Sequence, residues 1–173
     1  MSYAPQHLVL AIYPFTRGLA FVFFEGPGSP YLWGIKRTNK KRKSTKAVDE
    51  VRKLIEQHRP AALVIEDTTD GMSHRAARVR KLYRMLAHLA QSESVELQRI
   101  TKHELRDCFA LAGATTKYEI AKAIAVQMPN FVPRMPPIRK PWMSSDPRQS
   151  LFDAIALAIA FYRRLPTEAE RWK

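Results

Sequence analysis

The chain is poor in cysteine and has no long apolar run. Cys108 is the single cysteine among 173 residues, so an internal disulfide framework is excluded. One thiol fits a reducing compartment, and we expect a small buried side chain rather than a reactive group. The apolar run near the N-terminus covers only residues 8–12 and lacks a basic leader. It is far shorter than the roughly 18 residues of a membrane span. These scarcities predict a soluble cytoplasmic protein without a membrane partner.

Acidic residues are also scarce. The chain has 16 Asp and Glu against 29 Lys and Arg, which gives a formal net charge of +13. An excess this large destabilises a compact fold through self-repulsion, and it is typical of proteins that hold a polyanion. Nucleic acid is the expected partner, with DNA favoured over RNA. A membrane surface is disfavoured, because no basic amphipathic helix stands outside the core pattern.

The pattern of apolar residues predicts one α/β domain spanning residues 1–173. Runs of β-branched and aromatic residues indicate three strands that can pair antiparallel. Two helical patterns follow, and each leads into a further apolar strand of the kind buried in parallel sheets. The strands are expected at 8–13, 19–25, 31–36, 61–65 and 95–100, and the two helices at 44–58 and 73–91. The pattern therefore predicts a mixed sheet with helices on its faces.

Capping signals predict three more helices after the fifth strand. The sequences T-x-x-E at 101–104 and 116–119 are capping boxes, in which Thr and Glu side chains satisfy backbone amides. The run 146–149 offers an aspartate N-cap, a first-turn proline and a glutamine to close a third box. Residues 129–147 hold six of the twelve prolines, too many for regular structure, and predict a proline-rich loop. The helices are expected at 102–110, 117–128 and 147–164.

Two carboxylates are candidates for metal-assisted chemistry on a phosphodiester. Glu66 ends the apolar strand AALVIED, so it is either a functional group or the strand's exit into solvent. Asp153 lies in the apolar helix SLFDAIALAIAF, where a carboxylate is costly unless it is paired or liganded. Its alternative role is an acid near the helix start that the helix dipole stabilises. Carboxylates at strand ends and on a late helix can hold two Mg²⁺ or Mn²⁺ ions about 4 Å apart, which clamp the reacting oxygens.

Four segments resemble the RuvC-type Holliday junction resolvases in order and spacing. LVLAIYPFTRGLAF is similar to their first strand, turn and second strand, and LVIEDT to their second acidic strand end. LQRITKHELRDCFALAGATTKYEIAKAI resembles their fifth strand and the following helix pair, and SLFDAIALAIAF their final helix. The match covers residues 8–164. It implies a ribonuclease H-like fold, a five-stranded mixed sheet with helices on both faces. It also implies a metal-dependent, structure-selective DNA nuclease that is usually a homodimer.

The resemblance also implies roles for four residues. Glu66 and Asp153 match metal ligands, for Mg²⁺ or Mn²⁺. Lys102 and Lys117 match basic residues near the cleaved strand. These four residues are therefore the candidate catalytic residues.

Three departures weaken the match at its centre. Tyr13 stands where the first, metal-bridging aspartate belongs, and a neutral phenol does not bridge two divalent ions. Ser150 stands where those enzymes often have another acid. The loop 67–71, DTTDG, lacks the bulky aromatic expected to wedge at a junction centre. Asp67 and Asp70 are weak substitutes, because consecutive strand residues point to opposite faces and Asp70 lies in the loop.

Basic segments are the candidates for contact with nucleic acid, since basic clusters gain most of their affinity by releasing counterions. The run at 36–43 is alternatively a solvated loop, and the cations of the 73–91 helix are alternatively its solvent side. Trp142, in the proline-rich loop, can stack on a base or pack over the final helix. The candidate contact residues are Lys36, Arg37, Lys40, Lys41, Arg42, Lys43, Arg75, Arg78, Arg139, Lys140 and Trp142.

These observations favour a resolvase-like protein that binds branched or distorted DNA. In this interpretation its metal-dependent nuclease activity is weakened or lost, and no cofactor is required. One alternative is an active Mg²⁺- or Mn²⁺-dependent, structure-selective endodeoxyribonuclease with a rebuilt metal site. A second alternative is a general polyanion-binding or assembly subunit. The sequence leaves these three functions open.

Overall fold

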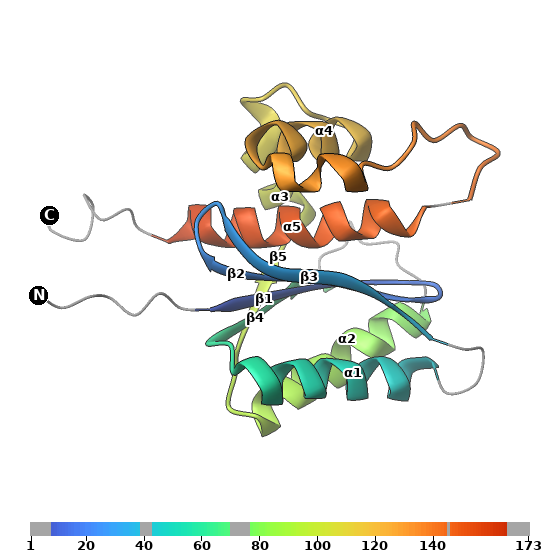
Figure 1. The fold of residues 1–173 in the computed structure, drawn as a ribbon. Coiled ribbons are helices and arrows are strands. Elements are labelled where there is room, and N and C mark those ends of the chain that lie inside the picture. The colour runs from blue at the N-terminus through green and yellow to red at the C-terminus, as the bar shows by residue number, and fades with distance from the viewer. Residues whose placement is uncertain (1–7, 39–42, 70–76, 145, 166–173) are drawn as a thin grey trace, which may run out of the picture.

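The structure is a computed structural model that describes residues 8–38, 43–69, 77–144 and 146–165. Its elements follow the predicted order, with one added 3-10 helix, η1 (Figure 1). The strands are β1 (Val9–Phe15), β2 (Gly18–Gly26), β3 (Ser29–Arg37), β4 (Ala62–Glu66) and β5 (Glu96–Ile100). The helices are α1 (Lys43–His58), α2 (Ala77–Ser92), α3 (Lys102–Ala110), α4 (Lys117–Gln127), η1 (Pro129–Arg134) and α5 (Pro147–Arg164).

The five strands form one mixed sheet in the order β3-β2-β1-β4-β5. β1 pairs antiparallel with β2, and β2 with β3, whereas β4 pairs parallel with both β1 and β5. This topology confirms the predicted mixed sheet. Because β1 and β4 are parallel neighbours, their carboxyl ends lie at the same edge of the sheet, where open α/β sheets usually place their sites.

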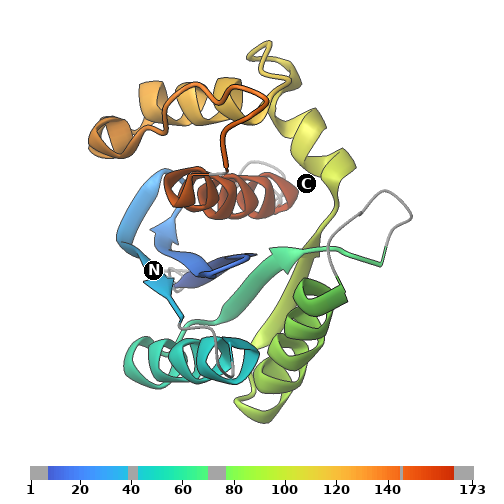
Figure 2. The same cartoon turned by 90° about the vertical axis from the view of Figure 1, so that its right-hand side faces the viewer.

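Helices cover both faces of the sheet, as predicted. α1 and α2 pack against one face and α5 against the other, while α3, α4 and η1 lie outside α5 (Figures 1 and 2). α5 is therefore enclosed on two sides, which explains why it is apolar over most of its circumference. Alternate residues of β1 divide between the two cores. Val9, Ala11 and Tyr13 belong to the core that includes α5, and Leu10 and Ile12 belong to the core that includes α1 and α2.

The hairpin between β1 and β2 is tighter than the sequence pattern predicts. Pro14 and Phe15 continue β1, and only two residues, Thr16 and Arg17, connect it to β2. Proline removes a ladder donor, so it is tolerated only where no partner needs that donor. The ladder between β1 and β4 ends at Ala11, so Pro14 lies beyond it and no hydrogen bond to β4 is lost there.

The prediction that residues 129–147 hold no regular structure is wrong for the first part of that segment. Pro129–Arg134 forms η1, with Pro129 at the start, where its missing amide hydrogen costs nothing. Phe131 of η1 is fully buried and packs edge-on against Trp33 of β3, with ring centroids 4.7 Å apart. It also packs edge-on against Phe152 of α5. Burial of this aromatic side chain fixes the entry to the proline-rich loop.

Two expectations from composition can be compared with the described residues. Cys108 is a buried free thiol, as predicted, and burial raises its pKa. None of the described helices combines the length and apolarity that crossing a membrane requires.

Candidate functional site

Tyr13 and Glu66 lie at the carboxyl ends of two neighbouring strands. The last paired residues of β1 and β4 are Ala11 and Val64, and each candidate follows two positions later. By strand alternation, both side chains are on the sheet face that α5 covers. Tyr13 is 7% exposed and Glu66 is 2% exposed. The fold therefore places the phenol and the carboxylate next to α5, although 53 positions separate them in the sequence.

Lys117 links Tyr13 to Asp153. Its ammonium Nζ donates to the Tyr13 hydroxyl at 3.1 Å and to Asp153 Oδ2 at 3.1 Å. The same nitrogen lies 5.1 Å from the centroid of the Tyr13 ring. The other Asp153 oxygen, Oδ1, accepts from the Gln149 side-chain amide at 3.3 Å. Both carboxylate oxygens thus have partners from this protein, which answers the energetic problem of an acid in an apolar helix.

The start of α4 holds Lys117 in place. The predicted capping box is present, because the Thr116 side chain accepts from the Glu119 amide and the Glu119 carboxylate accepts from the Thr116 amide. Glu119 also accepts from the amide and hydroxyl of Thr115. These hydrogen bonds lower the pKa of Glu119 to about 2. Gln149 of α5 donates to the Lys117 carbonyl at 3.3 Å, which ties the first residue of α4 to α5.

The charge of Lys117 is favoured by its surroundings. Partial burial disfavours the ammonium form, but the Asp153 carboxylate and the Tyr13 hydroxyl outweigh burial and raise the pKa of Lys117. The Asp153 side chain is 13% exposed, and that of Lys117 is 61% exposed. The Lys117 ammonium therefore bridges the phenol and the carboxylate.

Glu66 has a contact from α2, on the opposite face of the sheet from α5. The Tyr83 hydroxyl of α2 lies 3.5 Å from Glu66 Oε2, at the outer limit of a hydrogen bond. Tyr83 is itself buried, at 3% exposure. Glu66 is only 2% exposed, so it does not simply mark the point where β4 runs out into solvent. This burial favours a functional role for the carboxylate.

These side chains do not fit a site for two divalent ions. Tyr13 presents a phenol at the position that the resemblance assigns to a bridging carboxylate, and Lys117 places a positive charge beside Asp153. A metal ion at the same carboxylate would have to displace that ammonium. Among the residues that the structure describes, no group of three or more His, Cys, Asp or Glu side chains is arranged to hold a metal. We therefore derive no metal-dependent step from this arrangement.

The other acid and hydroxyl positions do not restore the missing ligand. Asp67 is engaged with its own loop, accepting from the amide and hydroxyl of Thr69 at 2.9 and 2.6 Å. The Thr69 hydroxyl lowers the pKa of Asp67. Ser150 is buried in α5 and brings a hydroxyl rather than a carboxylate. Asp70 lies outside the described residues.

Lys102 is at the same end of the sheet as Glu66. It is the first residue of α3, two positions beyond Ile100, and Ile100 is the register partner of Glu66. The Thr101 capping box that begins α3 is present as predicted. Lys102 is half-buried. Its catalytic role remains a proposal.

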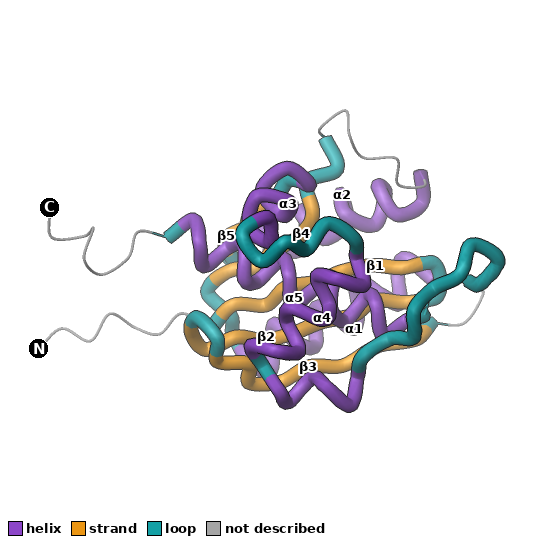
Figure 3. The backbone as a smooth tube through the Cα atoms, turned by 90° about the horizontal axis from the view of Figure 1, so that it is seen from above, coloured by secondary structure: helices purple, strands orange, loops and turns teal. Residues whose placement is uncertain are grey.

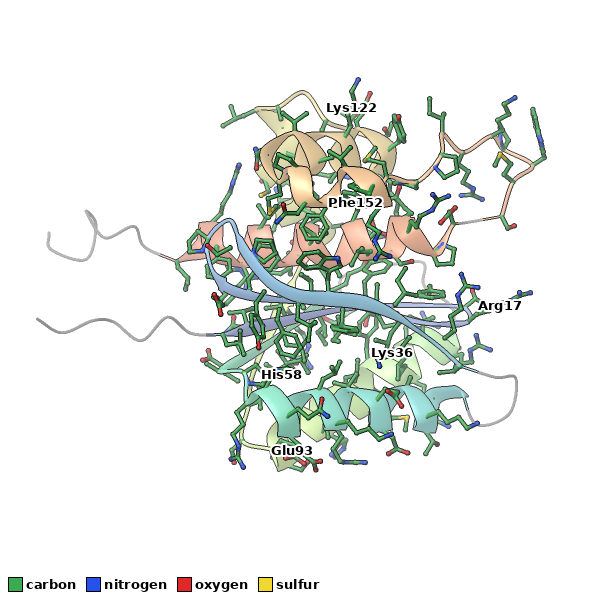
Figure 4. The ribbon with its side chains drawn as sticks, viewed as in Figure 1. Arg17, Lys36, His58, Glu93, Lys122 and Phe152 are labelled. Atoms are coloured by element: carbon green, nitrogen blue, oxygen red, sulfur yellow. The ribbon has the colours of Figure 1, made fainter. Side chains whose placement is uncertain are left out.

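The basic end of β3 forms a groove with α1. Lys36 and Arg37 line a cavity of about 530 Å³ together with Lys46 and Lys53 of α1. Lys36 points from β3 toward α1 (Figure 4), where it pairs with Glu50 at 3.6 Å. Arg37 is exposed. The groove is open, and its four cations outnumber the two acids of its lining, Asp49 and Glu50, which leaves an excess of positive charge for a phosphate chain.

Several predicted contacts have other partners or fall outside the structure. Arg78 of α2 donates to the Thr16 carbonyl in the β1–β2 turn, so part of its role is to stabilise that hairpin.

The candidate contacts in the proline-rich loop interact with one another and with the backbone of the loop. Arg139 donates to the Met143 carbonyl at 2.9 Å. Lys140 and Trp142 form a cation–π pair, with Nζ 5.3 Å from the ring centroid. Lys43 begins α1. The predicted contacts Lys40, Lys41, Arg42 and Arg75 lie outside the described residues.

Sequence reasoning missed two residues of the site, Gln149 and Tyr83. The motif at 146–149 predicted that Gln149 would close a capping box, but its amide instead donates to the Lys117 carbonyl and to Asp153. Asp146 alone supplies the predicted N-cap, accepting from the Arg148 amide at 2.9 Å. The signal for Gln149 was its position four residues before Asp153, which is one helical turn. Tyr83 had no sequence signal beyond the apolar face of its helix.

Comparison with known proteins identifies the fold. No protein-family model matches the sequence, and no curated protein matches it. Among solved structures, RuvC of Thermus thermophilus in complex with a Holliday junction substrate superposes with a TM-score of 0.62 at 16% identity, covering 92% of this chain and 97% of that one. The yeast mitochondrial Holliday junction resolvase gives 0.64 at 14% identity, covering 94% and 80%. The fowlpox virus Holliday junction resolvase gives 0.52 at 8% identity, covering 91% and 99%. The chain therefore has the ribonuclease H-like fold of the RuvC-type Holliday junction resolvases.

Proposed function

We propose that this protein binds branched or distorted DNA on a resolvase scaffold, and that its metal-dependent cleavage is weakened or lost. The observation that carries the proposal is the position of Lys117. Its ammonium lies 3.1 Å from both the Tyr13 hydroxyl and Asp153 Oδ2. This contact supplies a fixed cation at the carboxylate that the resemblance assigns to metal binding.

Binding is supported by charge and by shape. The net charge is +13. Arg17 marks the tip of the β1–β2 hairpin (Figure 4), at the same end as the start of α5 and the proline-rich segment (Figure 1). The groove beside Lys36 and Arg37 adds further cations. Phosphate contacts position a protein on DNA without reading sequence, so a structure-selective protein needs little more than such a surface of defined shape.

Loss of cleavage is supported by the chemistry of the centre. Two divalent ions would bring four positive charges to the attacking and leaving oxygens, and Lys117 brings one. That ammonium can still contact a phosphate oxygen, because its side chain is 61% exposed. The residues at the position that the resemblance assigns to metal binding then serve as a phosphate contact: Asp153 and Tyr13 orient Lys117, and Gln149 orients Asp153.

A binding titration tests this function. Fluorescence anisotropy should show that a four-way junction binds more tightly than a duplex of equal length at the same salt concentration. Arg37→Gln should weaken junction binding and reduce the slope of log K against log salt by about one. Lys122→Gln is the matched control, since it removes one exposed cation from α4, on the side of α5 remote from the sheet (Figure 4).

Equal affinity for junction and duplex would contradict the proposal and favour a general polyanion binder. An equal effect of Arg37→Gln and Lys122→Gln would also contradict it, because binding would then depend on net charge alone. The homodimer that the resemblance implies remains part of the proposal. Light scattering of the free protein and of its junction complex tests it, and a monomer in both states would remove it.

A further inference from the structure

Trp142 is exposed in a way that packing does not explain. Its side chain is 78% exposed, whereas Trp33 packs against Phe131 with ring centroids 4.7 Å apart. This exposure excludes the packing of Trp142 over α5 that its place in the sequence allowed. Single exposed apolar residues are common on protein surfaces, so exposure alone decides nothing. The turn, the position and the charges around Trp142 indicate its role.

The turn that carries the indole is stabilised by hydrogen bonds, and a lysine packs against the ring. Arg139 Nε donates to the Met143 carbonyl at 2.9 Å, and the Met143 amide donates to the Lys140 carbonyl at 3.0 Å. Pro141 restricts the backbone between them. Lys140 Nζ lies 5.3 Å from the centroid of the Trp142 ring. These contacts orient the ring before any ligand arrives, which lowers the entropy that binding would cost.

The turn projects from the end of the molecule that carries the candidate site. The segment 135–144 leaves η1, extends past the start of α5 and returns toward it (Figures 1 and 3). Its two anchors are firm, because Phe131 of η1 is buried and Asp146 forms the N-cap of α5. α5 then carries Asp153 at the candidate site. A ligand at the exposed indole can therefore continue toward that site.

The charge around the indole selects the class of ligand. Between Phe131 and Ser145 the sequence has three cations, Arg134, Arg139 and Lys140, and no acidic residue. An exposed aromatic ring among cations matches a ligand that joins a flat π-system to an anion. A nucleotide has both, and stacking on Trp accepts any base because every base has a π-face.

We propose that Trp142 stacks on an unpaired base at the branch point of bound DNA, while Arg139 and Lys140 contact the flanking phosphates. This inference deepens the proposed function and rests on it. Bases within a duplex are already stacked on their neighbours, so only a branched or distorted DNA offers one to the indole. Trp142 thereby contributes to the preference for branched DNA.

The test combines a protein change with a DNA change. Two junctions are prepared that are identical except at one position of the branch point, which carries either an unpaired adenine or an abasic residue. Trp142→Leu should bind the adenine junction roughly 5- to 150-fold more weakly than the wild type, the range that one base–aromatic stack supports. On the abasic junction the same variant should lose little. Trp142→Phe should retain most of the affinity, because it keeps a ring.

A spectroscopic signal separates stacking from a structural role. With 2-aminopurine in place of the adenine, binding of the wild type should quench the fluorescence of the base, and Trp142→Leu should abolish that quenching. Unchanged thermal unfolding of Trp142→Leu is expected, because the side chain is exposed. Equal losses on the adenine and abasic junctions would overturn the proposal, and so would unaltered quenching.

Two further outcomes distinguish a failure of the stacking proposal from a failure of the proposed function. If the wild type prefers junction over duplex but Trp142→Leu binds both junctions normally, the stacking proposal fails and the proposed function stands. If the wild type has no preference for the junction, the proposed function itself fails. A loss on heparin or on phosphatidylserine vesicles equal to that on the adenine junction would also refute stacking, since neither ligand has a base.

Discussion

The most informative stability test removes the ammonium of Lys117. Lys117→Met keeps the length of the side chain but deletes the donor that lies 3.1 Å from both the Tyr13 hydroxyl and Asp153 Oδ2. Asp153 then retains the Gln149 amide as its partner at Oδ1. A carboxylate that is only 13% exposed loses its counter-charge in this variant.

The expected cost follows from the exposure of the two groups. Fully exposed ion pairs contribute about 0.2–1 kcal/mol, and breaking a fully buried pair costs about 3–5 kcal/mol. Asp153 is nearly buried, but Lys117 is 61% exposed, so water screens the pair substantially. We therefore expect Lys117→Met to lower the free energy of unfolding by about 1–2 kcal/mol.

Urea unfolding at pH 7 measures this change, and a double-mutant cycle isolates the pair. Asp153→Asn is the second single variant, because it removes the charge and keeps the shape. The coupling energy between the two changes should be about 1 kcal/mol. A coupling below about 0.2 kcal/mol would refute the reasoning, since the ammonium would then be only a surface contact.

Three further predictions follow from the same structure. Tyr13→Asp should gain only weak Mn²⁺ binding while Lys117 remains, and Tyr13→Asp with Lys117→Met should bind Mn²⁺ at least about tenfold more tightly, because a competing cation is gone. Electron paramagnetic resonance of free Mn²⁺ measures the affinity of both variants. Equal affinities would contradict the idea that the Lys117 ammonium competes with the metal ion. Glu119 has its pKa lowered from 4.5 to about 2, so its contribution to stability is present above pH 4.5 and is lost as the pH falls toward 2. Thermal unfolding between pH 5 and pH 2 should show a smaller decline for Glu119→Gln than for the wild type, and parallel declines would contradict it. Gly18→Ala should cost about 1–3 kcal/mol in urea unfolding, since a Cβ at residue 18 would lie 2.0 Å from the Lys36 carbonyl oxygen. An unchanged unfolding midpoint would show that the strand end relaxes freely.

Local patterns were sufficient to predict most of the fold. Alternating and continuous apolar runs identified the five strands that the described residues form, because period-two burial on a sheet leaves a direct trace in the sequence. The two Thr–Glu capping boxes were correct, since the Thr and Glu of each box lie within one helical turn. The third predicted box was wrong, because Gln149 does not close it. The pattern failed where proline was treated as a breaker. Pro14 continues β1 beyond the ladder with β4, and Pro129 begins η1.

The candidate site was less predictable, because its contacts are long-range. Lys117 and Tyr13 are 104 positions apart, and Lys117 and Asp153 are 36 apart. The resemblance drew attention to all three residues, but it did not indicate that the Lys117 ammonium would contact both the Tyr13 hydroxyl and the Asp153 carboxylate. That contact depends on how α4 packs against α5. The different use of Gln149 has the same cause, because its amide is drawn to the Lys117 carbonyl.

We propose that this protein holds branched DNA without metal-dependent cleavage of its strands. A labelled four-way junction, incubated with saturating protein in Mg²⁺ and then in Mn²⁺, tests it most directly when binding and strand integrity are read from the same samples. We predict a fully bound junction whose strands stay intact in both metals. Nicks at defined positions that disappear in Glu66→Gln would contradict the account and establish an active nuclease.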